Sequence, residues 1–413
     1  MSERVVRVVL LTMLLLLASP DSLRGQDGSK VDSYTATSEY ASDSVHVARR
    51  VSMLDSTIER LEAAIIHYEE LAASGGWRAL PGGSNLRLGS RGPRIAVLRE
   101  RLSITGDLME DVMTADSTDR GNDDPSTRYV FDEAVDRAVR RFQERHGLEV
   151  DGIVGPKTRA ALNVPVKDRI RQLKINLKRL RAEPASFGSR FAVVNVPGFR
   201  LDVIEDGASV MSMKVIVGRP STPTPLFETR IEEVILAPYW YVPASITRNE
   251  LLPRERRDPG YMERNRIRQL PNGTYRQDPG PTNPLGKVKF TIPNPHGVVL
   301  HGTSEPWLFE RAECAFSHGC MRIERPVDLA VYLLEGTRWT REEIEREIAT
   351  WKQRIIRVRD PLPVYVRYWT AWVGEDGTVH FRRDLYGHDA SGFPHTTQAY
   401  FPAHVDWDAF VPS

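Results

Sequence analysis

The most informative part of the sequence consists of two short runs, His301-Gly302-Thr303 and Ser317-His318-Gly319-Cys320-Met321-Arg322. The chain has 2 cysteines among 413 residues, and one of them lies in the second run, between a glycine and a hydrophobic residue. A nucleophilic cysteine needs a base for the thiol proton, a group that orients the base, and donors for the oxyanion. The two histidines and the Gly-Cys backbone can supply all three. A buried structural cysteine does not need flanking histidines, so the pattern predicts a nucleophile at Cys320.

These runs resemble the signature of the L,D-transpeptidase catalytic domain (the YkuD-like family), a histidine followed at a similar distance by Ser/Thr-His-Gly-Cys. The resemblance implies that His301 is the general base and that the backbone carbonyl of Gly302 orients its imidazole. A carbonyl can fix an imidazole N–H as well as a carboxylate can, so no nearby Asp or Asn is needed. His318 lies two residues before the cysteine and remains an alternative base.

The other residues of the two runs are candidates for binding the oxyanion and the substrate. The backbone N–H groups of Gly319 and Cys320 are the natural oxyanion donors. The resemblance places Arg322 where the family holds substrate, and a guanidinium suits a carboxylate of a stem peptide; the alternative is a surface salt bridge. Cys314 lies outside the motif and is expected to pack in a core. Further candidates for contact with the substrate, or for hydrogen bonds within the turn, are His318, Ser317 and Thr303.

The composition and the absent motifs exclude several classes of function. Lys and Arg number 56 against 55 Asp and Glu, a formal charge of +1, which gives no reason to expect a nucleic-acid partner. The Cys-x-x-Cys and His-Glu-x-x-His spacings of zinc sites are absent, as are the glycine-rich loops that bind nucleotides. We therefore expect no metal and no cofactor. Two cysteines do not form a disulfide framework, so the fold depends on its cores.

Residues 1–25 have the layout of an export signal. Arg4 and Arg7 precede an apolar run over 8–18, and small and polar residues follow. The run is shorter than the ~20 residues of a typical membrane span. Two alternatives stay open, a cleaved signal peptide and an uncleaved anchor in the inner membrane. Both place the rest of the chain in the periplasm.

Residues 26–87 are expected to form a tether and a helix. The segment 26–44 is rich in Ser, Asp and Thr and low in apolar residues, which is typical of a flexible tether. From Val45 to Leu71 the apolar residues recur at helical spacing, and Ser74-Gly75-Gly76 ends the helix. Whether this helix forms a stalk or packs on the catalytic body is left open.

Residues 88–163 resemble the small three-helix peptidoglycan-binding domain. The resemblance rests on Ala138-Val139-Arg140-Arg141-Phe142-Gln143, on Gly147-Leu148, and on Asp151-Gly152-Ile153-Val154-Gly155-Pro156-Lys157-Thr158. A polar insertion at 116–126 departs from the usual pattern and falls on a surface that would face the glycan. A helical spacer without a ligand is the alternative, because a fold alone does not establish binding.

The rest of the chain is predicted to be a connecting helix (164–189), a catalytic domain (190–390) and a C-terminal tail (391–413). From Val166 to Arg181 the apolar residues recur at helical spacing with basic residues between them, which indicates a helix with a solvated face. Short strands follow, with a hairpin around Asp206-Gly207 and another around Asp376-Gly377 that joins 364–368 to 378–381. The fold class is α+β, a β-rich sandwich beside the small helical domain. The arginine-rich segment 237–285 resembles the capping subdomain of longer Gram-negative members.

The resemblance implies an exported cysteine acyltransferase that attacks tetrapeptide stems and forms 3→3 cross-links in peptidoglycan. The expected partners are stem peptides and glycan, and other wall-synthesis proteins are left open. Two alternatives use the same acyl-enzyme, transfer to water (an L,D-carboxypeptidase) and transfer to another acceptor. An alternative of another class is a non-catalytic anchor that binds the wall. The complete Cys/His set argues against an anchor, because a binder has no use for an activated thiol.

Overall fold

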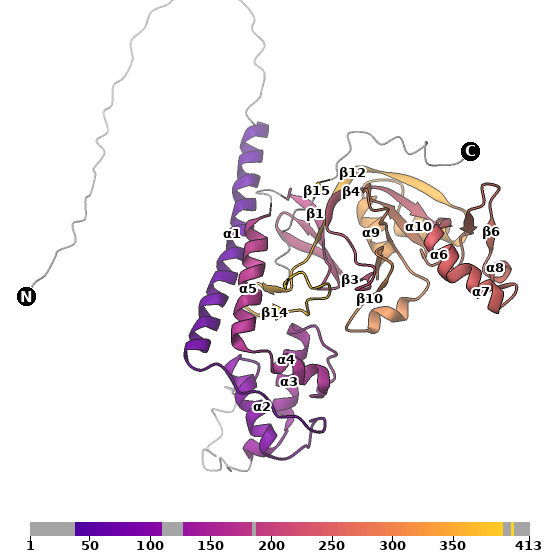
Figure 1. Ribbon diagram of the computed structural model, residues 1–413. Coiled ribbons are helices and arrows are strands. Elements are labelled where there is room, and N and C mark those ends of the chain that lie inside the picture. Colours follow the sequence, from indigo (N-terminus) through magenta and orange to yellow (C-terminus); the bar gives the residue numbers. More distant parts are fainter. Residues whose placement is uncertain (1–37, 110–126, 184–186, 391–397, 400–413) are drawn as a thin grey trace, which may run out of the picture. The chain divides into compact units, whose positions relative to one another are not determined.

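The computed structural model describes residues 38–109, 127–183, 187–390 and 398–399 (Figure 1). The expected export signal and the polar insertion at 116–126 lie outside these residues. The first described element is α1 (Ser38–Ala73). The expectation that the tether extends to residue 44 is therefore wrong, since the helix already begins at Ser38. A segment poor in apolar residues cannot pack in a core, but it can still extend a helix that is stabilised further along the chain. Within the part of the chain that the structure describes, no helix has the length and apolar character needed to cross a membrane.

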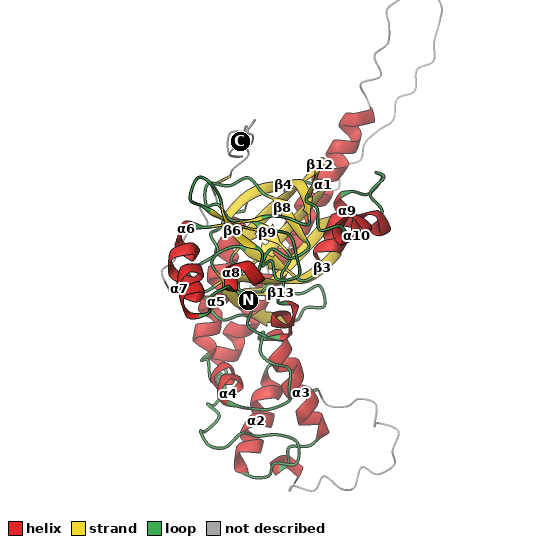
Figure 2. Ribbon diagram, turned by 90° about the vertical axis from the view of Figure 1, so that its right-hand side faces the viewer, coloured by secondary structure: helices red, strands yellow, loops and turns green. Residues whose placement is uncertain are grey.

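The small helical domain contains α2 (Pro93–Ile104), a 3₁₀ turn (Thr127–Tyr129), α3 (Glu133–Arg145) and α4 (Pro156–Leu162), which are seen as helices in Figure 2. Asp132 caps α3, since its carboxylate accepts a hydrogen bond from the Val135 N–H at 3.0 Å. Leu80 and Leu86 belong to the buried core of this domain, and Leu86 forms a β-bridge with Val154. The domain therefore begins before the expected residue 88, in a segment with no helical period to mark it.

The connecting helix is α5 (Val166–Arg181), with the bounds that its apolar period predicts. It packs in one core with the C-terminal half of α1 and with the hairpin of β13 (Ala371–Val373) and β14 (Val379–Phe381). The expected solvated face is confirmed by the exposed Lys167, Arg171, Lys174 and Lys178. The opposite face buries three polar residues as well, Arg169, Asn176 and Arg179. Each of the three has a tertiary partner, since Arg169 donates to the Ala161 carbonyl, Asn176 donates to Thr370 and Arg179 pairs with Asp389.

The second hairpin is also corrected. Strand β14 pairs with β13 and not with 364–368, which belongs to the long strand β12 (Arg354–Arg367) of the main sheet. The sequence marks the turn at Asp376-Gly377 but does not determine which of two upstream apolar runs forms the partner strand.

The catalytic domain is built on one large sheet. Its other strands are β1 (Arg190–Asn195), β2 (Arg200–Glu205), β3 (Ala208–Gly218), β4 (Phe227–Leu236), β8 (Val288–Thr291), β9 (Leu300–His301), β10 (Ala315–Ser317), β11 (Met321–Ile323) and β15 (Gln398–Ala399). The order is β10-β3-β11-β9-β8-β4-β12-β1-β2, with β15 beside β4. The predicted hairpin of β2 and β3 is confirmed, and its pairing closes the order on itself. The main core therefore lies inside one continuous, β-rich sheet, and helices α9 (Pro326–Leu333) and α10 (Arg341–Ala349) pack against that core.

The segment expected to be a cap forms a small subdomain between β4 and β8. It contains β5 (Trp240–Val242), α6 (Ala244–Ile246), a π-helical turn (Thr247–Leu251), α7 (Leu252–Arg257), α8 (Tyr261–Arg264), β6 (Ile267–Gln269) and β7 (Tyr275–Gln277). The three strands form their own sheet in the order β5-β7-β6. Val242, Leu251 and Ile267 form a separate buried core, so the subdomain has its own packing.

Candidate active site

Two neighbouring strands bring the predicted base and nucleophile together. Strands β9 and β11 are parallel neighbours, with Leu300 opposite Met321 and His301 opposite Arg322. Cys320 immediately precedes β11, and the next N–H, that of Met321, donates to the Val299 carbonyl at 3.0 Å. Because hydrogen-bonded strands lie ~4.8 Å apart, a thiol and an imidazole separated by 19 positions in the chain become neighbours.

The imidazole of His301 is held by the backbone that follows it. The residue is 4% exposed, and its Nδ1 lies 2.6 Å from the carbonyl oxygen of Gly302. A carbonyl only accepts hydrogen bonds, so the proton is on Nδ1 and Nε2 is left with its lone pair. Burial, together with the charges of Arg322 and Lys289, lowers the pKa of His301 to about 3, against the opposing effect of backbone carbonyls. His301 is therefore neutral, the form that can accept a proton.

The thiol of Cys320 is half-buried and free. Burial raises its pKa above the ordinary value, while a backbone hydrogen bond at Val299 and the charges of Arg322 and Lys289 act in the opposite direction. The resting pair is thus a neutral thiol beside a neutral imidazole. Attack by Cys320 would therefore require transfer of its proton to His301 during or just before the attack.

The turn that carries the nucleophile is held by its own hydrogen bonds. Ser317 Oγ donates to the Cys320 carbonyl at 2.6 Å and accepts from the Gly319 N–H at 3.1 Å. Gly319 has φ +111°, in the region that favours glycine. Ser317 is 2% exposed, so its expected contact with the substrate is replaced by a role inside the turn. The Gly319 N–H is likewise occupied, whereas the N–H of Cys320 has no hydrogen-bond partner among the described residues.

Residues that the sequence did not single out support this turn from outside. Thr224 Oγ donates to the Gly319 carbonyl at 2.9 Å and accepts from the Gly218 N–H at 2.9 Å. Tyr386 Oη donates to the Gly218 carbonyl at 2.7 Å and accepts from the Thr224 N–H at 3.2 Å. The turn therefore depends on the segment after β3 and on the C-terminal part of the domain.

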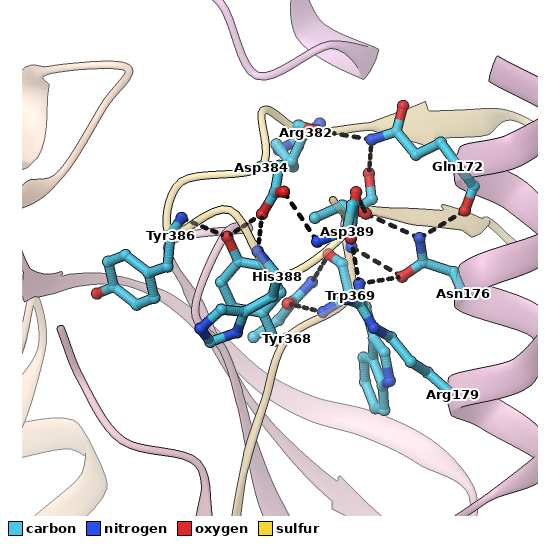
Figure 3. Close-up of polar contacts among 12 residues, drawn as sticks. Gln172, Asn176, Arg179, Tyr368, Trp369, Arg382, Asp384, Tyr386, His388 and Asp389 are labelled. Carbon is cyan, nitrogen blue, oxygen red and sulfur yellow. Dashed lines mark hydrogen bonds and ion pairs between the residues drawn. The ribbon is translucent and has the colours of Figure 1, made fainter. Parts of the chain in front are cut away.

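A polar network connects Tyr386 to α5 (Figure 3). The Tyr386 N–H donates to Tyr368 Oη, which donates to Asp384, each at 2.7 Å. Asp384 accepts the N–H of Asp389 at 2.8 Å, and the Asp389 carboxylate pairs with Arg179 of α5 at 2.6 Å. This network links the segment 384–389, which includes Tyr386, to the connecting helix. No sequence motif marks it.

The expected substrate-binding residues meet two glutamates. His318 is exposed, and its Nε2 lies 2.7 Å from the carboxylate of Glu250 in the cap. Arg322 Nη1 donates to Glu305 at 2.9 Å, with 15% of the arginine side chain exposed. Thr303 Oγ accepts from the Glu305 N–H at 3.0 Å. Arg322 and Thr303 thus lie together on one side of the site, and His318 lies at the contact with the cap.

The cap contributes a further charge to this rim. A hydrogen bond with Tyr261 raises the pKa of Arg254, and the carboxylates of Glu250 and Glu305 add to that effect. Arg254 therefore lies within electrostatic reach of both glutamates that pair with the expected substrate-binding residues. Sequence reasoning found the arginine-rich segment but not these acidic partners. Among the described residues, no group of three or more His, Cys, Asp or Glu side chains is arranged to hold a metal ion.

Comparison with known proteins gives independent information on both domains. Residues 189–344 match the family described as "L,D-transpeptidase catalytic domain" (YkuD), and residues 91–162 match "Putative peptidoglycan binding domain". The chain is 30% identical over 237 residues to a "Putative L,D-transpeptidase" of Haemophilus influenzae, an alignment that covers 53% of this chain and 48% of the relative. The chain thus spans about half the length of the curated relative that it matches.

Solved structures with similarity to the chain include two L,D-transpeptidases. The one from Xylanimonas cellulosilytica has a TM-score of 0.22 and 18% identity, covering 70% of this chain and 99% of that one. The one from Stackebrandtia nassauensis has a TM-score of 0.26 and 14% identity, covering 68% and 94%. From the family matches and the motifs above, residues 189–344 are an L,D-transpeptidase catalytic domain of the YkuD family, preceded by a domain of the peptidoglycan-binding family.

Proposed function

We propose that this chain is a cysteine L,D-transpeptidase that forms 3→3 cross-links between peptidoglycan stems. The observation that carries the proposal is the pairing of β9 with β11, which sets Cys320 beside a neutral His301 whose Nδ1 is held 2.6 Å from the Gly302 carbonyl. A structural cysteine would gain nothing from this arrangement, whereas a nucleophile needs it.

In the proposed first step, His301 Nε2 takes the Cys320 proton as the sulfur attacks the carbonyl of the third stem residue. The new C–S bond converts the carbonyl into an oxyanion, which the N–H of Cys320 is placed to stabilise. When the C–N bond to the fourth residue breaks, the imidazolium returns the proton to the leaving amine of D-Ala. The product of this half-reaction is a thioester on Cys320.

In the second step, the amine of a neighbouring stem's third residue attacks the thioester. His301 takes a proton from the amine, the C–S bond breaks, and the sulfur regains a proton from the imidazolium. Arg322 is proposed to bind a stem carboxylate, which must then compete with Glu305 for the guanidinium.

The test is mass spectrometry of muropeptides after the purified protein is incubated with sacculi rich in tetrapeptides. The expected product is a dimer joined between two third residues, absent with Cys320→Ala and present with Cys314→Ala. Tripeptides without dimers would identify a carboxypeptidase instead. Intact tetrapeptides with both the parent and the Cys314→Ala protein would overturn the enzymatic proposal and favour a wall-binding anchor.

We further propose that the helical domain binds peptidoglycan and that the protein acts in the periplasm. The match of residues 91–162 supports the first part. A fragment of residues 77–164, which keeps Leu80 and Leu86 in the core, should co-sediment with insoluble sacculi. A soluble, folded fragment that stays in the supernatant while the full chain pellets would make this domain a spacer.

A further inference from the structure

Lys289 lies in line with the active-site histidine, at a position that no motif marks. It is directly opposite His301 in the antiparallel pair of β8 and β9, and His301 is directly opposite Arg322 in β11. Residues opposite each other on paired strands project from the same face of a sheet. The strands thus present Lys289, His301 and Arg322 as one row, with Cys320 at the start of β11.

The other face of these strands is the main core, which rules out packing as the reason for this lysine. The alternating residues Val288, Phe290, Leu300 and Met321 are each 0% exposed in that core. Lys289 is half-buried on the opposite face. Its ammonium makes no hydrogen bond or ion pair with any described residue, although burying an unpaired charge is costly. A cost of this kind usually accompanies a functional role.

The charges around the thiol show what the ammonium can act on. Burial lowers the pKa of Lys289, while Cys320 and the carboxylate of Glu233 raise it. Reciprocally, Lys289 and Arg322 lower the pKa of Cys320 against the larger effect of burial. The arginine is already paired with Glu305, so the lysine is the less compensated of the two cations. The remaining ionisable groups of the site are His301 on β9, His318 on the nucleophile turn and Glu250 in the cap.

We infer that Lys289 is a positioning residue for the proposed reaction, holding a fixed positive charge beside Cys320 that favours the thiolate over the thiol. The inference rests on the proposed role of Cys320 as nucleophile. The same charge makes the His301 imidazolium a stronger acid once it forms, which favours protonation of the leaving amine. No bond to substrate is required of the lysine.

The test measures the thiol directly and needs no peptidoglycan. In a Cys314→Ala background, the rate of alkylation of Cys320 by iodoacetamide is recorded between pH 6 and pH 10. Lys289→Met should raise the apparent pKa of the thiol and slow alkylation near pH 7.5 by roughly three- to tenfold, since one pKa unit is tenfold in thiolate. Lys289→Arg should retain the parent profile. The matched control is Lys287→Met, an exposed lysine just before the same strand, which should change nothing.

The proposal is overturned if Lys289→Met and the parent share one pH profile. It is also overturned if Lys289→Arg slows alkylation as much as Lys289→Met does. The size and shape of the lysine side chain, and not its charge, would then be what matters. If Lys289→Met does not fold, Lys289→Gln takes its place, with the melting temperature as the check. Alkylation does not require acyl transfer, so the two experiments are independent. A negative alkylation result would leave the muropeptide assay valid, and a negative muropeptide result would leave the pH profile of alkylation interpretable.

Discussion

The two cysteines lie six positions apart and have opposite surroundings. Cys314 is 1% exposed, packs with Ile216 and Phe309, and its thiol donates to the Arg311 carbonyl at 3.2 Å. Burial raises its pKa to about 11. Cys320 is half-buried, and its pKa is also raised by burial. It has a neutral imidazole on the neighbouring strand β9 and two cations that oppose the effect of burial, Arg322 on β11 and Lys289 on β8.

The comparison teaches that burial does not separate a reactive thiol from an inert one in this chain. Desolvation acts on both in the same direction. The difference comes from the strands that each thiol meets. Cys314 packs with apolar side chains and backbone carbonyls, and the carboxylates of Glu313 and Glu324 counter the one cation that acts on it, Lys214. Cys320 lies at the end of a row that contains His301 and two cations. The proposed reactivity of Cys320 therefore depends on strand register, and each prediction below tests one part of that difference.

The largest expected effect is the loss of the thiol itself. Cys320→Ala should abolish acylation, measured by intact-protein mass spectrometry with a tetrapeptide stem, because no other nucleophile is placed to replace it. Cys314→Ala should acylate like the parent and lose about 1 kcal/mol in free energy of unfolding, the usual cost of a small core truncation. Acylation of the Cys320→Ala protein would show that Cys320 is not the nucleophile.

The next largest effect concerns the base. His301→Ala should lower the acylation rate by roughly 10²- to 10⁴-fold, the usual contribution of general base catalysis. His318→Ala should cost far less, since this side chain is exposed and its Nε2 contacts Glu250. A larger loss in His318→Ala than in His301→Ala would reverse the assignment of the base.

A pH titration compares the two thiols in one molecule. Both pKa values are raised in the fold, so alkylation of either thiol should increase as pH rises above the ordinary range. Cys320 should react at least about tenfold faster than Cys314 at pH 8, measured by peptide mapping, because cations oppose its burial and it is more accessible.

The raised pKa of Cys314 also makes the stability of the fold depend on pH. The unfolded thiol ionises near about pH 8.5, whereas the folded Cys314 keeps its proton up to about pH 11. Its contribution to the free energy of unfolding is therefore complete below about pH 8.5 and is lost as the pH rises toward 11.

The cap contacts the surroundings of Cys320 and offers a smaller effect. Replacing residues 240–277 by a short Gly-Ser linker should spare acylation and lower the ratio of dimers to tripeptides by on the order of tenfold, since the acceptor amine must outcompete water. The wider segment 237–285 is unsuitable, because Ala237, Asn283 and Leu285 are buried in the body of the domain. The linker can be short, since Trp240 and Gln277 are paired. An unchanged ratio at matched acylation rates would assign acceptor choice to the sheet.

The smallest effect is expected from one contact of that cap. Glu250→Gln keeps the shape of the side chain but removes the charge that lies 2.7 Å from His318. The dimer-to-tripeptide ratio should fall by about two- to threefold, as expected for an exposed pair. Glu255→Gln serves as a control in the same cap, since Glu255 accepts only from the N–H groups of Gly260 and Met262 within it. Equal effects of the two variants would mean that the cap, and not its contact with the turn, is being altered.

Local sequence determined much of this protein. The apolar period of 166–181 predicted α5 with its bounds, and Asp206-Gly207 predicted the pairing of β2 with β3. The two motif runs identified Cys320 and His301, and the structure places the carbonyl of Gly302 against the imidazole, as the family resemblance implied. These features could be predicted because a helical period, a turn and a hydrogen bond between adjacent residues each depend on only a few neighbouring positions of the chain.

Tertiary structure alone decided the charges around the thiol. Lys289 reaches the active site through the register of β8 with β9, and Glu250 reaches His318 from a subdomain folded elsewhere in the chain. For Ser317 the sequence left contact with substrate and hydrogen bonds within the turn as alternatives. The structure shows the second, since its hydroxyl bonds two backbone groups of a buried turn. Strand order and register depend on pairings between distant segments, and shifting a strand by one residue would move every side chain to the other face. The local pattern of residues along the chain does not determine this order and register.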